Sequence, residues 1–406
     1  GGAHEHPLVA ALHGGHIRVA ELLFQHGASV EVQGRFARTP LHRAVEWSND
    51  VAVGAVQFLL EHGADANARQ QDLSTPLHLG AARGYFEVAH MLLHRGADVN
   101  SRDVVGGTPL HLVSKRTFQR SEDSCLNLVQ LLLNYGAKVD SRDKNDATAL
   151  HNASLMRDLE VVRVLLNRGA PVNAEDYRSR TPLHQLLEAG DYSGADRFGI
   201  VSKKRKKEDR FGVAQLLVQH GADVNALAEN LETPLHLASH LPELKLARML
   251  FEYGADASVN AADYQDRTPL HRVLWAGDRS DADRFGVAQL LIERGADVNA
   301  PDEYHQTPLH PASYFVELKF VRMLLDHGAN VNTEGSRGLT PLHRVWRAKG
   351  HPDKDRFGVA QLLMERGANV NARDQNHETP LHLASRLVSL DGAWILLKYG
   401  ANLNAE

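Results

Sequence analysis

The sequence predicts an all-α protein, a solenoid of about 11 stacked helix–loop–helix units joined by β-turn fingers. Three observations predict it. The tetrapeptide Thr-Pro-Leu-His recurs nine times with two degenerate copies, a Gly-Ala pair follows every copy, and the most frequent distance between copies is 33 residues. Because the two markers alternate along the whole chain, they define one repeating unit.

The tetrapeptide marks the beginning of each unit, so residues 1–406 are expected to form a single repeat array. The units start near residues 6, 39, 75, 108, 148, 181, 233, 268, 307, 340 and 379. Extra residues lie mainly between the two helices of alternate units. The longest insertion covers residues 191–208 in the sixth unit.

Each unit carries its own helix signals. Thr is a good N-cap, and Pro is tolerated at the first helical position because its missing N–H would have no partner there. After Thr75, Leu77 begins a short first helix, and Val88 and Leu92 continue at helical spacing in a second one. Gly96 supplies the positive φ that the helix end needs. One unit cannot bury its own apolar face, so neighbouring units must stack.

This pattern resembles the ankyrin repeat, whose period is 33 residues and whose signature is T-P-L-H-x-A. Residues 75–79 read TPLHL and residues 96–100 read GADVN, which match that repeat closely. The resemblance covers essentially the whole chain, and an array of fungal type is our interpretation. It implies a protein-interaction scaffold whose concave surface is made of finger tips and the exposed side of the first helix.

Positions three and four before each tetrapeptide, and seven and eight after its first residue, vary among the units, as expected of side chains that point outward. Exposed Trp, Tyr and Arg dominate the energetics of protein interfaces. The predicted partner-binding residues are Trp47, Arg83, Lys115, Arg116, Met156, Tyr177, Arg178, Tyr264, Trp275, Tyr304, Tyr314, Phe315 and Arg347. For the aromatic residues the alternative is packing beneath the insertions.

Histidine is abundant, but its pattern is structural. Ten of the 24 histidines belong to the tetrapeptide, one in each unit, and helices pack about 8–10 Å apart. Two of them therefore cannot share one zinc ion, and the resemblance implies local hydrogen bonds instead. These histidines are His42, His78, His111, His151, His184, His236, His271, His310, His343 and His382.

Composition and motifs argue against several function classes. The net charge of −5 gives no general attraction to nucleic acid, and no apolar run approaches the roughly 18 residues of a membrane span. The chain lacks phosphate-binding glycine loops, His-Glu-x-x-His and Cys-x-x-Cys, so we expect no enzyme, no cofactor and no metal site. With a single cysteine, Cys125, it cannot form an intrachain disulfide, and we expect an intracellular location, cytoplasmic or nuclear.

We therefore expect a non-catalytic, monomeric scaffold that binds a protein or an extended peptide on its concave face. One alternative is a sensor or autoinhibitory segment of a larger signalling protein, such as a receptor or a channel. The start without Met and the end directly after a consensus-like unit fit that alternative. The third hypothesis is an enzyme that uses the groove as its active site.

The insertion at 191–208 contains five consecutive cations, Lys203, Lys204, Arg205, Lys206 and Lys207. Such a run repels itself and should be solvated, and it is similar to a monopartite nuclear-import signal. Two alternatives stay open. The run could be a by-product of the local duplication of Asp-Arg-Phe-Gly, or it could contact a polyanion.

Residues 196–213 fused to a cytosolic reporter are expected to carry the reporter into the nucleus, because the basic run has the composition of an import signal. Imaging of the reporter in living cells gives the readout. The control is the same fusion with Lys204→Ala and Arg205→Ala. A reporter that stays in the cytoplasm would reject the import signal and favour the duplication by-product.

Overall fold

The structure is a computed structural model. It describes residues 6–115, 122–188, 207–241, 243–276, 281–348, 352–387 and 390–405. The chain divides into two compact units, unit 1 at residues 1–222 and unit 2 at residues 223–406. Arg116 and the basic residues Lys203 to Lys206 lie outside the described residues. For Lys207 only the helical backbone is described.

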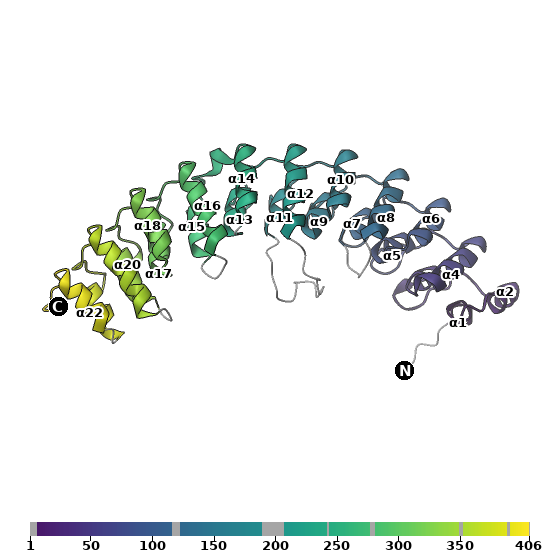
Figure 1. The fold of residues 1–406 in the computed structure, drawn as a ribbon. Coiled ribbons are helices and arrows are strands. Elements are labelled where there is room, and N and C mark those ends of the chain that lie inside the picture. Colours follow the sequence, from purple (N-terminus) through teal and green to yellow (C-terminus); the bar gives the residue numbers. More distant parts are fainter. Residues whose placement is uncertain are drawn as a thin grey trace. The chain divides into compact units, whose positions relative to one another are not determined.

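The described residues are predominantly helical, which confirms the predicted all-α class (Figure 1). Unit 1 contains α1 (Pro7–His13), α2 (Ile17–Gln25), α3 (Pro40–Val45), α4 (Asn49–Glu61), α5 (Pro76–Arg83), α6 (Phe86–His94), α7 (Pro109–Ser114), α8 (Glu122–Asn134), α9 (Ala149–Met156), α10 (Leu159–Asn167), α11 (Pro182–Glu188) and α12 (Lys207–Gln219). One 3₁₀ turn, η1 (Arg35–Ala37), precedes α3.

Unit 2 repeats the same alternation of a short helix and a second helix. It contains α13 (Pro234–His240), α14 (Leu244–Glu252), α15 (Pro269–Trp275), α16 (Asp281–Glu293), α17 (Leu309–Tyr314), α18 (Leu318–Asp326), α19 (Pro341–Arg347), α20 (Asp353–Glu365), α21 (Pro380–Arg386) and α22 (Leu390–Lys398). The 3₁₀ turns η2 (Ala255–Ser258) and η3 (Ser336–Gly338) lie between helix pairs. In the described part of the chain, β pairing is limited to an isolated bridge between Gly335 and Leu339.

Within each unit, helices pack both inside a pair and between consecutive pairs. In unit 1, α5 packs against α6 of its own pair and α7 of the next, and α6 packs against α4 and α8. In unit 2, α15 packs against α13, α16 and α17. The leucines that follow the tetrapeptide proline form the centre of this packing, and Leu77, Leu110 and Leu270 are essentially inaccessible to solvent. Burial of one leucine side chain stabilises a fold by about 1.5–3 kcal/mol.

The tetrapeptide begins the first helix of a pair through a reciprocal capping box. The Thr side chain faces the backbone of the His three residues later, and the His side chain faces the Thr backbone. Eight described N-caps have this arrangement: Thr39, Thr75, Thr108, Thr148, Thr233, Thr268, Thr340 and Thr379. The sequence prediction that Thr caps these helices is therefore confirmed at these positions.

The glycine of each Gly-Ala pair ends the second helix in a left-handed conformation. Gly96 has φ 81° and Gly136 has φ 86°. An added Cβ would meet no atom within 4 Å at either position. Glycine is therefore required by backbone conformation, not by lack of space.

Gly136→Val is expected to destabilise the protein by about 2 kcal/mol, because a β-branched residue is strained at positive φ. Gly54→Val is the matched control. Gly54 lies in α4 with helical backbone and open space around its Cβ position, so the same side chain should be close to neutral there. Urea unfolding followed by circular dichroism measures both. Equal losses for the two variants would contradict the strain argument.

Candidate functional site

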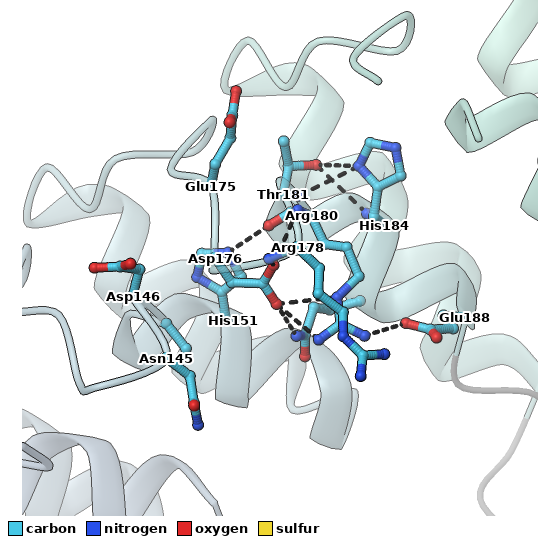
Figure 2. A network of polar contacts seen from close by, with 12 residues as sticks. Asn145, Asp146, His151, Glu175, Asp176, Arg178, Arg180, Thr181, His184 and Glu188 are labelled. Carbon is cyan, nitrogen blue, oxygen red and sulfur yellow. Dashed lines mark hydrogen bonds and ion pairs between the residues drawn. The ribbon is translucent and has the colours of Figure 1, made fainter. Parts of the chain in front are cut away.

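An aspartate organises the turn at the tip of most fingers. The Oδ1 atom of Asp176 accepts hydrogen bonds from the backbone N–H groups of Arg178 at 2.9 Å and Arg180 at 3.0 Å (Figure 2). Its Oδ2 atom pairs with the Arg180 guanidinium at 2.7 Å. Burial disfavours the charged form, but the hydrogen bonds from Arg180 and the backbone outweigh it and lower the pKa of Asp176. The turn is thus fixed by a charged, internally satisfied carboxylate.

Backbone hydrogen bonds join consecutive fingers into rows. In unit 1 the N–H of Tyr177 donates to the Asn145 carbonyl at 2.9 Å. In unit 2 the N–H of Tyr264 donates to the Asn230 carbonyl at 3.0 Å, and Glu303 donates to Gln265 at 2.9 Å. These bonds use only main-chain atoms, so they leave the side chains at the finger tips free to differ from one unit to the next.

The tetrapeptide histidines bridge neighbouring fingers from below. Nδ1 of His151 accepts the backbone N–H of Thr148 at 3.1 Å, and its Nε2 lies 2.9 Å from the Arg180 carbonyl. Since a carbonyl only accepts, Nε2 carries the proton and the ring is neutral. Both ring nitrogens are therefore engaged and neither is available to a metal.

Burial is the largest influence on these imidazoles and lowers their pKa, although the hydrogen bond to the backbone carbonyl partly opposes it. A second proton on Nδ1 would also face a backbone N–H donor. The pKa of His310 is lowered from 6.5 to about 4. The histidines with a lowered pKa are His42, His78, His111, His151, His236, His271, His310 and His343.

In unit 1 the predicted partner-binding residues differ in exposure. Tyr177 is 54% exposed at a finger tip, and the Arg178 guanidinium lies 5.1 Å from the centre of its ring. Trp47 is only 9% exposed and stacks on the imidazole of His13 at 4.7 Å, so most of its ring is inside the fold. Lys115 lies 3.9 Å from the Asp143 carboxylate. Arg83 and Met156 are half-buried at the ends of α5 and α9.

In unit 2 the predicted residues gather on one side. Tyr264 and Tyr304, on consecutive fingers, are 61% and 51% exposed. Trp275, Tyr314 and Phe315 form an aromatic cluster at the ends of α15 and α17, with ring centres 5.8 Å apart for Trp275 and Phe315 and 5.3 Å apart for Tyr314 and Phe315. Both contacts are edge-to-face, which is a favourable arrangement of aromatic rings.

The fingers and the cluster belong to one surface because a charged network connects them. The Arg267 guanidinium lies 6.0 Å from the Tyr264 ring and 3.1 Å from the Asp263 carboxylate. Arg272 lies 2.9 Å from the same carboxylate and is three residues before Trp275 in α15, hence on the same helix side. We call this side of unit 2, with Tyr264, Trp275, Tyr304, Tyr314, Phe315 and Arg347, the finger face.

The sequence prediction missed two arginines beneath the finger face. Arg272 and Arg344 each lie four residues after the tetrapeptide Thr, on the first helices α15 and α19. Burial lowers the pKa of both guanidinium groups. Variation at this fourth position among the units was the signal that could have revealed them. Arg347, which was predicted, lies one turn further along α19, 4.0 Å from the Asp374 carboxylate.

Paired helices, glycine-ended second helices and aspartate-organised fingers define a helical repeat protein. A family model described as ankyrin repeats in three copies matches residues 8–103, 110–196, 206–302, 262–335, 279–374 and 332–406. The chain therefore belongs to the ankyrin-repeat family. This confirms the family that the tetrapeptide and the Gly-Ala pair suggest.

Similar proteins share the repeat over short stretches. The human Ankyrin repeat and SOCS box protein 6 is 43% identical over 90 residues, which is 22% of this chain and 21% of that protein. The Saccharomyces cerevisiae probable 26S proteasome regulatory subunit p28 is 34% identical over 91 residues, 22% of this chain and 37% of that protein. The Drosophila melanogaster transient receptor potential cation channel subfamily A member 1 is 30% identical over 98 residues, which is 23% of this chain and 8% of that protein. The matches thus span well under half of these relatives.

Among the described helices, none is both long and apolar enough to cross a membrane. Cys125 is buried and is not part of a disulfide.

The thermal midpoint of unfolding is expected to fall as the pH is lowered from 6.5 towards 4. The unfolded chain binds protons on its histidines near their ordinary pKa of 6.5, whereas in the folded chain eight of the ten tetrapeptide histidines resist protonation until lower pH. The stabilisation is therefore complete above pH 6.5 and decreases below it. Scanning calorimetry between pH 7.5 and 4.5 measures the change.

His310→Gln should flatten this pH dependence, since it removes a buried imidazole whose pKa is lowered to about 4. His94→Gln, at an exposed position of α6, controls for the substitution of a histidine as such. A thermal midpoint that rises as the pH is lowered from 6.5 to 5 would contradict the assignment of neutral imidazoles.

Proposed function

We propose that this protein is a non-catalytic scaffold that binds a protein or an extended peptide on its finger face. Ankyrin repeats are generally protein-interaction modules, and the family is generally non-catalytic. The observation that carries the proposal is the finger face of unit 2. It offers two exposed tyrosines on fixed fingers beside an edge-to-face aromatic cluster.

The finger face is preorganised for binding. Main-chain hydrogen bonds hold Tyr264 and Tyr304 at a fixed separation, and Asp263 and Asp302 cap their turns. Aromatic side chains held rigidly bury a large area on binding with little loss of conformational entropy. Tyr177 with Arg178 offers a second anchor of the same type in unit 1.

A second candidate function is a sensor or autoinhibitory segment of a larger signalling protein. It is supported by similarity to a stretch of a cation channel subunit that spans 8% of that protein. In that case the finger face would bind another part of the same protein. We propose that the protein acts inside the cell, in the cytoplasm or the nucleus, because its single cysteine gives no sign of a fold that depends on disulfides.

Trp275→Ala combined with Tyr304→Ala is expected to weaken peptide binding at least thirtyfold, because truncation of an interface hot spot costs about 2 kcal/mol or more. The ligands are peptides selected on the full chain from a phage-displayed library of random dodecapeptides, and calorimetry measures their affinity. Tyr253→Ala is the control. Tyr253 is 43% exposed at the end of α14, outside the finger face.

Peptides whose affinity drops equally in the double variant and in the control would show that binding lies elsewhere. Circular dichroism of each variant verifies that the helices are retained.

A further inference from the structure

We propose that Arg344 receives a carboxylate from the partner, an Asp or Glu side chain of an extended peptide whose neighbouring apolar residue contacts the aromatic cluster. This inference rests on the proposed function and names the chemistry of the ligand. Two arginines occupy the same place in two repeats of unit 2 but differ in the groups that surround them.

Arg272 and Arg344 are structural counterparts. Each follows the tetrapeptide Thr by four residues on a first helix, α15 and α19. Arg272 is compensated by two carboxylates from the chain itself. Its Nη2 atom lies 2.9 Å from Oδ2 of Asp263 and forms an ion pair with Glu232. Asp263 comes five residues before Thr268 in the same repeat. Glu232 comes one residue before Thr233, which begins the tetrapeptide of the preceding repeat.

At Arg344 both of these carboxylates are replaced. Gly335 lies five residues before Thr340, the position that Asp263 occupies relative to Thr268. Gln306 occupies the position of Glu232, one residue before the tetrapeptide of the preceding repeat. Arg344 donates from Nη2 to Oε1 of Gln306, which is a neutral amide oxygen. Its Nε atom is buried and has no hydrogen-bond partner. Among the described residues, no carboxylate lies within the 4.0 Å of an ion pair with Arg344.

Two acids of neighbouring fingers, Asp302 and Asp374, use their Oδ1 atoms in their own turns. Asp302 accepts the backbone N–H groups of Tyr304 at 2.9 Å and Gln306 at 2.8 Å. Oδ1 of Asp374 accepts the backbone N–H groups of Asn376 at 2.8 Å and Glu378 at 2.9 Å, whereas its Oδ2 is buried without a hydrogen-bond partner and lies 4.0 Å from Arg347. Arg347 is thus the guanidinium nearest to Asp374, and the nearby Asp302 uses Oδ1 in its own turn, so neither acid forms an ion pair with Arg344.

A guanidinium that is partly removed from water and lacks a carboxylate is an unfavourable arrangement in the free protein. Burial, and after it the charge of Arg347, lowers the pKa of Arg344, and the charges of Asp302 and Tyr314 oppose this shift only in part. A carboxylate that arrives with a partner gains a charge-assisted hydrogen bond in a partly desolvated place, where it is stronger than in water. At Arg272 the chain itself supplies the carboxylates, and at Arg344 a ligand would supply one.

The neighbourhood also fits an apolar residue next to that acid. Tyr314 is close enough to Arg344 to interact with it electrostatically, and it contacts Phe315, which contacts Trp275. A carboxylate is favoured over a phosphate because Asp302 and Asp374 lie nearby. A dianion would be repelled more strongly by these two acids than a single charge would be.

The experiment uses dodecapeptides selected on the full chain from the phage-displayed random library. A selected peptide is synthesised in two forms, with its acidic residue as Glu and as Gln, and calorimetry measures both affinities. The readout is the ratio of the two affinities. Partial unfolding of a variant lowers both affinities equally and leaves this ratio unchanged.

In the wild-type protein the Glu peptide should bind at least tenfold more tightly, since a hydrogen bond to a charged group is worth about 1.5–3 kcal/mol. In Arg344→Met the ratio should fall to about one. Gln306→Glu should also reduce the ratio, because it supplies the carboxylate from within as Glu232 does for Arg272. This substitution faces Asp302, whose Oδ2 lies 3.4 Å from the Gln306 amide, so stability is not its readout.

Arg272→Met is the matched control. It removes an equivalent guanidinium that the chain already neutralises, and the ratio should remain at the wild-type value. Selected peptides without an acidic residue, or a ratio that survives Arg344→Met, would overturn the assignment of Arg344. If those same peptides still lose affinity on Trp275→Ala, the finger face binds peptides and only the carboxylate inference fails.

If no peptide depends on Trp275, the proposed function fails and the inference fails with it. A phosphoserine form that binds more tightly than the Glu form would overturn the choice of carboxylate.

Discussion

Hydrogen bonds of the buried tetrapeptide histidine connect the two levels on which this protein is organised. Nδ1 of His151 completes the cap of its own helix, and Nε2 donates to a carbonyl 29 residues later, at the base of the next finger. One neutral side chain therefore fixes a helix end and the position of the following finger. The same arrangement recurs at His271, whose Nε2 lies 3.0 Å from the Gln306 carbonyl. These histidine hydrogen bonds hold consecutive fingers at a fixed spacing.

Because buried hydrogen bonds hold the helices and fingers in place, the exposed residues at the finger tips can vary. The positions that bridge units are buried and nearly invariant along the chain, whereas finger tips carry residues as different as Val104, Tyr177 and Glu303. Charged side chains at the base of the fingers are mostly neutralised within the chain, as Asp176 is by Arg180. A charged side chain that has no oppositely charged partner within the chain is available to a ligand, and we infer that Arg344 is such a side chain.

Much of the fold could be predicted because its signals are local. Thr75 and His78 interact across three residues, and the φ of Gly96 depends on one residue alone. Exposure on the binding side was harder to predict, since it depends on neighbouring units. Trp47 and Trp275 occupy nearly the same place relative to their tetrapeptides, yet Trp47 stacks on His13 and is 9% exposed while Trp275 is 37% exposed.

The sequence by itself determined the class, the family and the identity of the framework residues, because each unit repeats the same short-range capping and turn interactions. Only the tertiary structure decided which side chains remain available to a partner. Arg272 and Arg344 look alike in the sequence, but the groups that receive their Nη2 hydrogen bonds, Glu232 and Gln306, lie 40 and 38 residues away. Stacking of the repeats brings these distant positions together, and the presence of carboxylates at one contact and an amide at the other determines whether the arginine is neutralised.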